Sequence, residues 1–268
     1  MVNEMKERAA LEAIRAEMAE LPGHLGFYYK NLVSGLTFGV GEDEIYSAAS
    51  VIKFPLFLQI LQMDAKGLLS LDDVITTEED DKVPSCGALN MFTGAVTCDI
   101  RTLCRLMICI SDNTATNRLI RHLSLTEVER GFAELGLEKT RIRRLLFDRV
   151  AASKGIQNTI CPREIGALLE KLYHGEIVDR DTDDYALQIL AEQQIGHKLD
   201  GKLCEIVPIS HKTGEDEGLS NDVGIVFAPQ PFIVCFTGHD TDVYRWEDLM
   251  RRGAYELYMA QMHTESDG

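Results

Sequence analysis

The sequence predicts an α+β fold in which one antiparallel sheet is built from both ends of the chain. Strand-like segments occur near the two ends, whereas the apolar spacing of residues 47–197 is helical almost throughout. Because strands must pair to be stable, we expect residues 1–46 and 198–268 to form one α/β lobe of a single unit. Residues 47–197 would then be an inserted helical lobe, with the functional site between the two lobes.

The amino-acid composition argues against several classes of function and partner. The chain has 268 residues, enough to bury a core without disulfide bonds. Its net charge of −16 argues against nucleic-acid and anionic-membrane partners, and no stretch is long enough to cross a bilayer. Seven scattered cysteines, without a C-x-x-C pair or zinc-ligand spacing, indicate reduced thiols. The N-terminal segment lacks the apolar centre of a signal peptide, which predicts a cytoplasmic protein, or an exported one if a leader has been removed. Oligomeric state remains unknown.

The first elements are a helix and a hairpin. Residues 1–21 form an amphipathic helical pattern, and residues 26–29 and 36–40 read as two strands around a turn at 31–35. The helical middle is broken by polar loops such as residues 76–83.

Three helices of the middle segment have clear boundaries. The apolar run 100–110 predicts a helix buried on all sides that stops at Ser111. A capping-box pattern at 124–127 begins a helix that runs to about Leu135, and Pro162 begins one that ends before Gly175. Residues 140–159 are irregular, and either a surface loop or a short helix pair fits them.

The last third returns to strands and closes with an amphipathic helix over residues 243–262. The predicted strands are residues 203–208, 209–213, 223–228 and 232–237.

A serine and a lysine one helical turn apart, Ser50 and Lys53, stand at the start of a long apolar run. Positions i and i+3 share a helix face, so the amine can reach the hydroxyl. Burial disfavours a charged amine, and Lys53 could therefore be the base that activates Ser50. Taken alone, the pair also fits a helix start whose lysine extends to solvent.

Two further motifs follow in order: Ser111-Asp112-Asn113 and Lys212-Thr213-Gly214. Alone, the first could be a helix cap and the second a strand end. Together with S-x-x-K, they resemble the signature of class A β-lactamases and penicillin-binding proteins, serine hydrolases with a β-lactamase/transpeptidase-like fold. The resemblance covers most of residues 24–240 and includes residues 46–49, 159–164 and 221–225.

The resemblance implies an acylation mechanism at Ser50. Lys53 would take the serine proton, directly or through a relay, and Ser111 would pass it to the leaving nitrogen. Asn113 would bind the substrate's side-chain amide and steady Lys53. No metal or other cofactor is required, and the implied partner is a small-molecule substrate: a β-lactam, a peptide or an ester.

The third motif is implied to bind the substrate. Lys212 and Thr213 would hold its carboxylate, beside Gly214. The family's oxyanion hole corresponds to the backbone N–H groups of Ser50 and Glu215.

Two departures put fast turnover of penicillins in doubt. The loop glutamate that activates water in class A enzymes is absent from residues 141–149, where its position falls on Leu145 or Leu146. The nearest carboxylate, Asp148, could replace it as base or could instead pair with a neighbouring arginine. The arginine that many members use against the substrate carboxylate is also missing, and Val223 or a neighbour stands there.

These observations favour a serine hydrolase that is acylated at Ser50 and deacylated slowly. A true β-lactamase with a substitute base, a D-alanyl-D-alanine peptidase or esterase, and a non-turnover β-lactam sensor remain alternatives.

Overall fold

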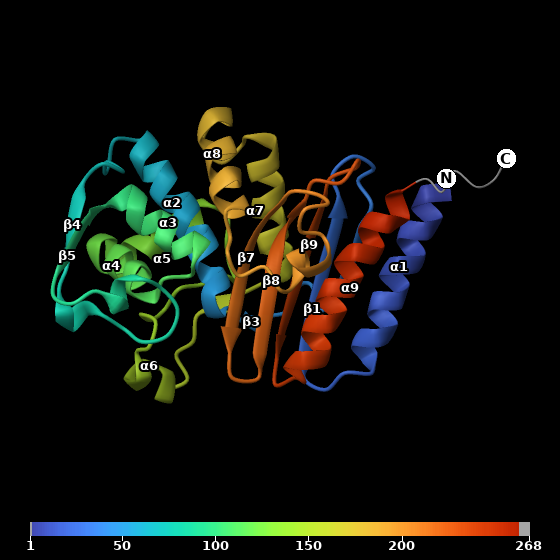
Figure 1. The fold of residues 1–268 in the computed structure, drawn as a ribbon, viewed down its shortest axis with the longest axis horizontal. Coiled ribbons are helices and arrows are strands. Elements are labelled where there is room, and N and C mark those ends of the chain that lie inside the picture. Colours follow the sequence, from blue (N-terminus) through green and yellow to red (C-terminus); the bar gives the residue numbers. More distant parts are fainter. Residues whose placement is uncertain (1, 263–268) are drawn as a thin grey trace.

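The computed structural model describes residues 2–262 and contains a five-stranded antiparallel sheet with strand order β2-β1-β9-β8-β7 (Figure 1). The strands are β1 (His24–Asn31), β2 (Thr37–Val40), β7 (Ile209–Asp216), β8 (Leu219–Val226) and β9 (Phe232–His239). Strand β1 pairs with β9 along its whole length, so the two ends of the chain meet in the middle of the sheet. This arrangement confirms the α+β fold class.

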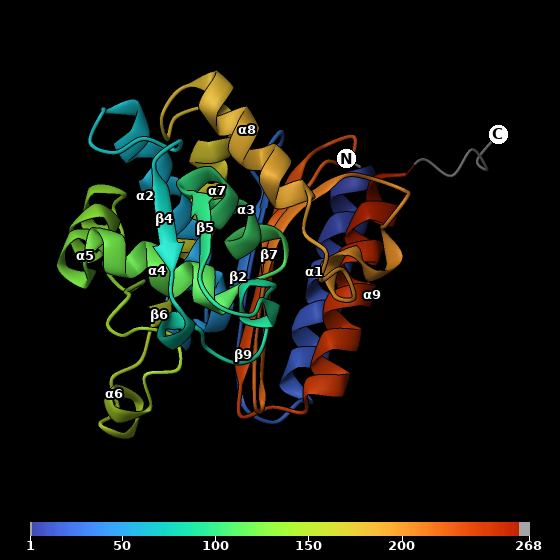
Figure 2. The ribbon, with the colours of Figure 1, turned by 60° about the vertical axis from the view of Figure 1, so that its left-hand side comes forward.

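Helices cover both faces of the sheet (Figures 1 and 2). Helices α1 (Val2–Ala19) and α9 (Val243–Gln261) pack against each other, and α9 lies on β8 and β9. Helices α7 (Pro162–His174) and α8 (Arg180–Ala191) contact the sheet from the other face. Successive side chains of a strand point to opposite faces, and two separate apolar cores result.

Most of the remaining elements lie beyond α7 and α8, on the side of the molecule away from α1 and α9, and a few contact β7, β8 or β9 (Figure 1). The helical elements are η1 (Ala49–Ile52), α2 (Lys53–Ala65), η2 (Glu79–Asp81), η3 (Leu89–Met91), α3 (Ile100–Cys109), α4 (Asn113–Leu123), α5 (Leu125–Glu134) and α6 (Arg149–Ser153). Two small two-stranded sheets accompany them: β3 (Tyr46–Ser47) with β6 (Thr159–Ile160), and β4 (Val74–Thr77) with β5 (Val96–Asp99). Short polar side chains begin these helices. Asp99, Asp112 and Ser124 each accept a hydrogen bond from the backbone N–H three residues on. Gly175, at φ 74°, ends α7 as predicted.

Several predicted elements were wrong. Residues 203–208 form turns after η4 (Leu199–Lys202), because the N–H groups of Leu203 and Cys204 bond locally to the carbonyl of Asp200. Residues 74–77 are a strand, since β5 supplies a partner that is distant in sequence. Helix α3 exposes Thr102 and Arg105 and is therefore amphipathic.

Residues 140–159 form a loop that carries one short helix, α6, at the margin of the molecule (Figures 1 and 2). Among the described residues, no helix is both long and apolar enough to span a membrane.

Candidate active site

Ser50 lies in the η1 turn, directly before helix α2. Its neighbour Ala49 has a positive φ of 42°, a conformation that side chains other than glycine rarely adopt. Strand β7 runs close to this turn, because a Cβ atom at Gly214 would lie 3.1 Å from the backbone nitrogen of Ser50. Glycine at this position therefore lets the backbone of β7 approach the amide of Ser50.

Lys53 is fully buried under this turn. Its Nζ donates hydrogen bonds to Asn113 Oδ1 at 2.7 Å, to the Ser111 carbonyl at 2.8 Å and to Ser111 Oγ at 3.0 Å. Burial, followed by repulsion from Lys212, holds the pKa of Lys53 well below its usual range. Within residues 2–262, no hydrogen bond joins Lys53 to Ser50.

Ser111 connects the helical side of the site to the sheet. It occupies the junction between α3 and α4 with φ 55°, a strained conformation that costs about 1–3 kcal/mol. In this position its Oγ also accepts a hydrogen bond from Lys212 Nζ at 3.2 Å. The hydroxyl thus lies between two buried amines.

Lys212 is fully buried on β7, and its Nζ also donates to the Thr213 carbonyl at 2.9 Å. Burial lowers the pKa of Lys212 to about 7, against the opposing effect of the Asp222 carboxylate. An amine with this pKa is partly charged at neutral pH.

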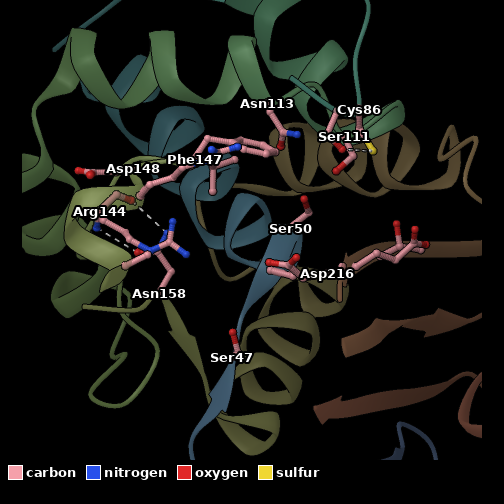
Figure 3. A pocket seen from close by; sticks show the side chains of 18 of the residues that line it. Ser47, Ser50, Cys86, Ser111, Asn113, Arg144, Phe147, Asp148, Asn158 and Asp216 are labelled. Atoms are coloured by element: carbon pink, nitrogen blue, oxygen red, sulfur yellow. Dashed lines mark hydrogen bonds between the residues drawn. The ribbon is translucent and has the colours of Figure 1, made fainter. Parts of the chain in front are cut away.

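Residues of the three sequence motifs border one cleft of about 580 Å³ (Figure 3). Ser50, Ser111 and Asn113 line it from the helical side, and Thr213, Gly214 and Glu215 line it from β7. Lys53 and Lys212 reach the cleft through Ser111, whose Oγ accepts a hydrogen bond from each of them. The structure therefore brings residues from all three sequence motifs to one place.

Asp148 also lines the cleft, but it is engaged as the N-cap of α6. Its Oδ1 accepts a hydrogen bond from the Ala151 N–H at 2.9 Å, and its carboxylate is directed away from Ser50 (Figure 3). In the described part of the chain it makes no salt bridge with Arg144 or Arg149.

Of the two leucines that could occupy the glutamate position, Leu146 lines the cleft and Leu145 packs against the core. The buried side chain of Asn117 fixes Leu146 in place. It accepts from the Leu146 N–H and donates to the Leu146 carbonyl, both at 2.9 Å. The side chain at the cleft is therefore apolar.

Sequence reasoning missed Lys198. This lysine precedes η4 and is fully buried, and its Nζ lies 2.8 Å from Glu215 Oε1 and 3.3 Å from the Asn221 carbonyl. Its ammonium group lies next to strand β7, which also carries Lys212. No local motif marks it, because its contacts are made by residues at least 17 positions away.

The side chains of His197, Glu215 and Glu247 bring potential metal ligands within 4.8 Å of one another. The ammonium of Lys198 lies among them, 2.8 Å from Glu215 and 3.9 Å from Glu247. This one ammonium therefore offsets part of the negative charge of the two carboxylates.

The chain is similar to known proteins over most of its length. The model of the beta-lactamase enzyme family matches residues 9–260. A β-lactamase of Streptomyces lavendulae is 28% identical over 243 residues, which span 86% of this chain and 79% of that protein.

Solved structures extend the similarity to the fold. The structure of PBP-A has a TM-score of 0.85 at 30% sequence identity and covers 94% of this chain and 95% of its own. A leucine-to-glutamate variant of PBP-A, solved as an acyl-enzyme complex with penicillin G, matches with a TM-score of 0.85 at 29% identity, over 94% of this chain and 96% of its own. A β-lactamase from Sphaerobacter thermophilus has a TM-score of 0.85 at 26% identity, over 96% of this chain and 97% of its own. The chain belongs to the beta-lactamase enzyme family and is a serine hydrolase of the β-lactamase-like type.

Proposed function

We propose that the protein is a class A-like acyl hydrolase that β-lactams or related amides and esters acylate at Ser50, and that it releases the acyl group slowly. One observation carries this proposal. Two buried lysines of lowered pKa converge on Ser111 beside Ser50, whereas the cleft position expected for a water-activating glutamate holds Leu146.

In the acylation step, Ser50 Oγ attacks the substrate carbonyl carbon and its proton passes to the neutral amine of Lys53. The hydrogen bond between Ser50 and Lys53 forms once substrate is bound, since catalytic hydrogen bonds often tighten only in the complex. The N–H groups of Ser50 and Glu215 stabilise the developing oxyanion. Ser111 relays the proton to the leaving nitrogen.

The substrate carboxylate binds to charged Lys212 and to the hydroxyl of Thr213. Lys198 strengthens this binding as a second positive charge, in place of the arginine that many family members carry. Asn113 serves two functions: its Oδ1 holds Lys53 at 2.7 Å, and its amide group lines the cleft.

Deacylation needs a base that activates water against the ester carbonyl. Leu146 has no titratable group, and the Asp148 carboxylate caps α6. The acyl-enzyme complex of the PBP-A variant with penicillin G supports the view that this type of cleft accommodates a bound penicillin.

Intact-protein mass spectrometry after mixing with benzylpenicillin tests the proposal. We expect a stoichiometric adduct on the wild type that persists for many minutes, and no adduct on Ser50→Ala. Rapid turnover without accumulated adduct would instead show an efficient β-lactamase. A folded wild type that forms neither adduct nor product would refute acylation by β-lactams, and an ester and a D-alanyl-D-alanine peptide would then be tried as substrates.

A further inference from the structure

Two histidines face each other at the end of the sheet where the neighbouring strands β1 and β9 begin and end, respectively. His24 and His239 are directly paired in the strand register. Their side chains meet, with His24 Nδ1 3.0 Å from His239 Nε2. Neither residue lines the cleft described above.

The other nitrogen of each ring is held by a carboxylate. His24 Nε2 lies 2.5 Å from Glu44 Oε2, and His239 Nδ1 lies 2.9 Å from Asp240 Oδ2. An ionised carboxylate only accepts hydrogen bonds, so both outer nitrogens carry protons. The two inner nitrogens, His24 Nδ1 and His239 Nε2, therefore face each other.

This arrangement matches the surroundings of histidine ligands in metal sites. Such histidines donate their second ring N–H to a carboxylate, which fixes the tautomer and directs the other nitrogen to the metal. The ring of Tyr46 stacks on His24, with centroids 4.3 Å apart and planes 20° apart, and limits its rotation. Both imidazoles are therefore oriented before any ion binds.

The spacing of the inner nitrogens suits a small divalent ion. Metal–nitrogen bonds of about 2.0–2.1 Å place two ligands about 3.3 Å apart at a tetrahedral ion and about 2.8 Å apart at a square-planar one. The observed 3.0 Å lies between these values. The side chains are 39% and 29% exposed, so water can complete the coordination.

We propose that His24 and His239 form a binding site for a late first-row divalent cation, Cu²⁺ or Zn²⁺, in which both inner ring nitrogens ligate the metal. Imidazole nitrogen suits both ions, and Cu²⁺ binds more tightly. The bound ion links His24, the first residue of β1, to His239, the last residue of β9.

The test uses untagged, chelator-treated full-length protein and isothermal titration with CuSO₄ or ZnCl₂. We expect one equivalent bound by the wild type, and at least tenfold weaker binding by His24→Gln and by His239→Gln. The matched control is His197→Gln, which alters a separate, exposed histidine–carboxylate cluster and should bind as the wild type does.

Glu44→Gln keeps both ring ligands and removes one orienting carboxylate, which should weaken binding on the order of tenfold. The Cu²⁺ complex should show an electron paramagnetic resonance spectrum with two equatorial nitrogens, and circular dichroism verifies that each variant is folded. Equal binding by all variants, loss of binding only in His197→Gln, or absence of binding by the wild type would each overturn the proposal.

Discussion

The hydroxyl oxygen of Ser111 lies 3.0 Å from the Nζ atom of Lys53, and the strained backbone of Ser111 holds it there. A proton that Lys53 takes from Ser50 therefore has a direct acceptor on the way to the leaving nitrogen. We expect Ser111→Ala to slow acylation by benzylpenicillin by on the order of 10²-fold, the usual contribution of a positioned proton-transfer group.

Quenched-flow mass spectrometry measures this rate. Ser85→Ala is the matched control, because Ser85 also lines the cleft but contacts neither lysine in the described structure. Equal acylation rates in the two variants would exclude Ser111 from proton transfer.

Leu146→Glu should supply the missing base. Asn117 anchors the backbone of residue 146 on both sides, so the new carboxylate extends into the cleft. We expect decay of the penicillin adduct to accelerate by about 10²-fold or more. Leu145→Glu is the control: it places a carboxylate toward the core, which should lower stability without faster decay. Unchanged decay in Leu146→Glu would contradict the assignment of this position.

Asp148 should be dispensable for turnover. Its carboxylate caps α6, and Asp148→Asn retains an oxygen that can accept the Ala151 N–H. We therefore expect residual nitrocefin hydrolysis to stay within about twofold of the wild type, since asparagine caps helices about as well as aspartate. A large loss in a correctly folded variant would show that Asp148 is the deacylation base.

Binding of anionic substrates should weaken as the pH rises through about 7. The pKa of Lys212 is lowered to about 7, so this lysine is charged below that pH and neutral above it. Burial also lowers the pKa of Lys53 well below its usual range, which favours its role as a base. Between pH 6 and 8 the dissociation constant for benzylpenicillin should rise by up to about tenfold, the change in the charged fraction of such a group.

An uncharged phenyl ester should show no such rise. Stopped-flow acylation at several substrate concentrations separates the dissociation constant from the rate. Parallel pH profiles for the penicillin and the ester would rule out Lys212 as the carboxylate-binding group.

Glu215→Gln should favour anionic substrates. The Glu215 carboxylate lines the cleft and pairs with buried Lys198 at 2.8 Å, so it offsets positive charge where a substrate carboxylate would bind. We expect the variant to bind benzylpenicillin about two- to tenfold more tightly, as expected for the loss of a nearby like charge at partial solvent exposure. Asp216→Asn, which removes an exposed cleft carboxylate without an ion pair among the described residues, should have a smaller effect. Weaker binding by Glu215→Gln would contradict this role.

Local patterns determined much of the fold. The hairpin of β1 and β2, the ends of α5 and α7, and strands β7, β8 and β9 follow from apolar periodicity, capping side chains and glycine. The predicted strand at residues 203–208 was wrong because local hydrogen bonds to Asp200 satisfy that backbone. Such a choice depends on whether a partner strand is present, which the segment itself does not encode.

By itself the sequence determined the fold class and the three motifs that predict acylation at Ser50. Only the tertiary structure placed Leu146, and not Leu145, at the cleft, revealed Lys198 beside Glu215, and brought His24 next to His239. The physical reason is the same in each case. The positions and contacts of these side chains depend on groups 17 to 215 residues away, which become neighbours only when the chain has folded.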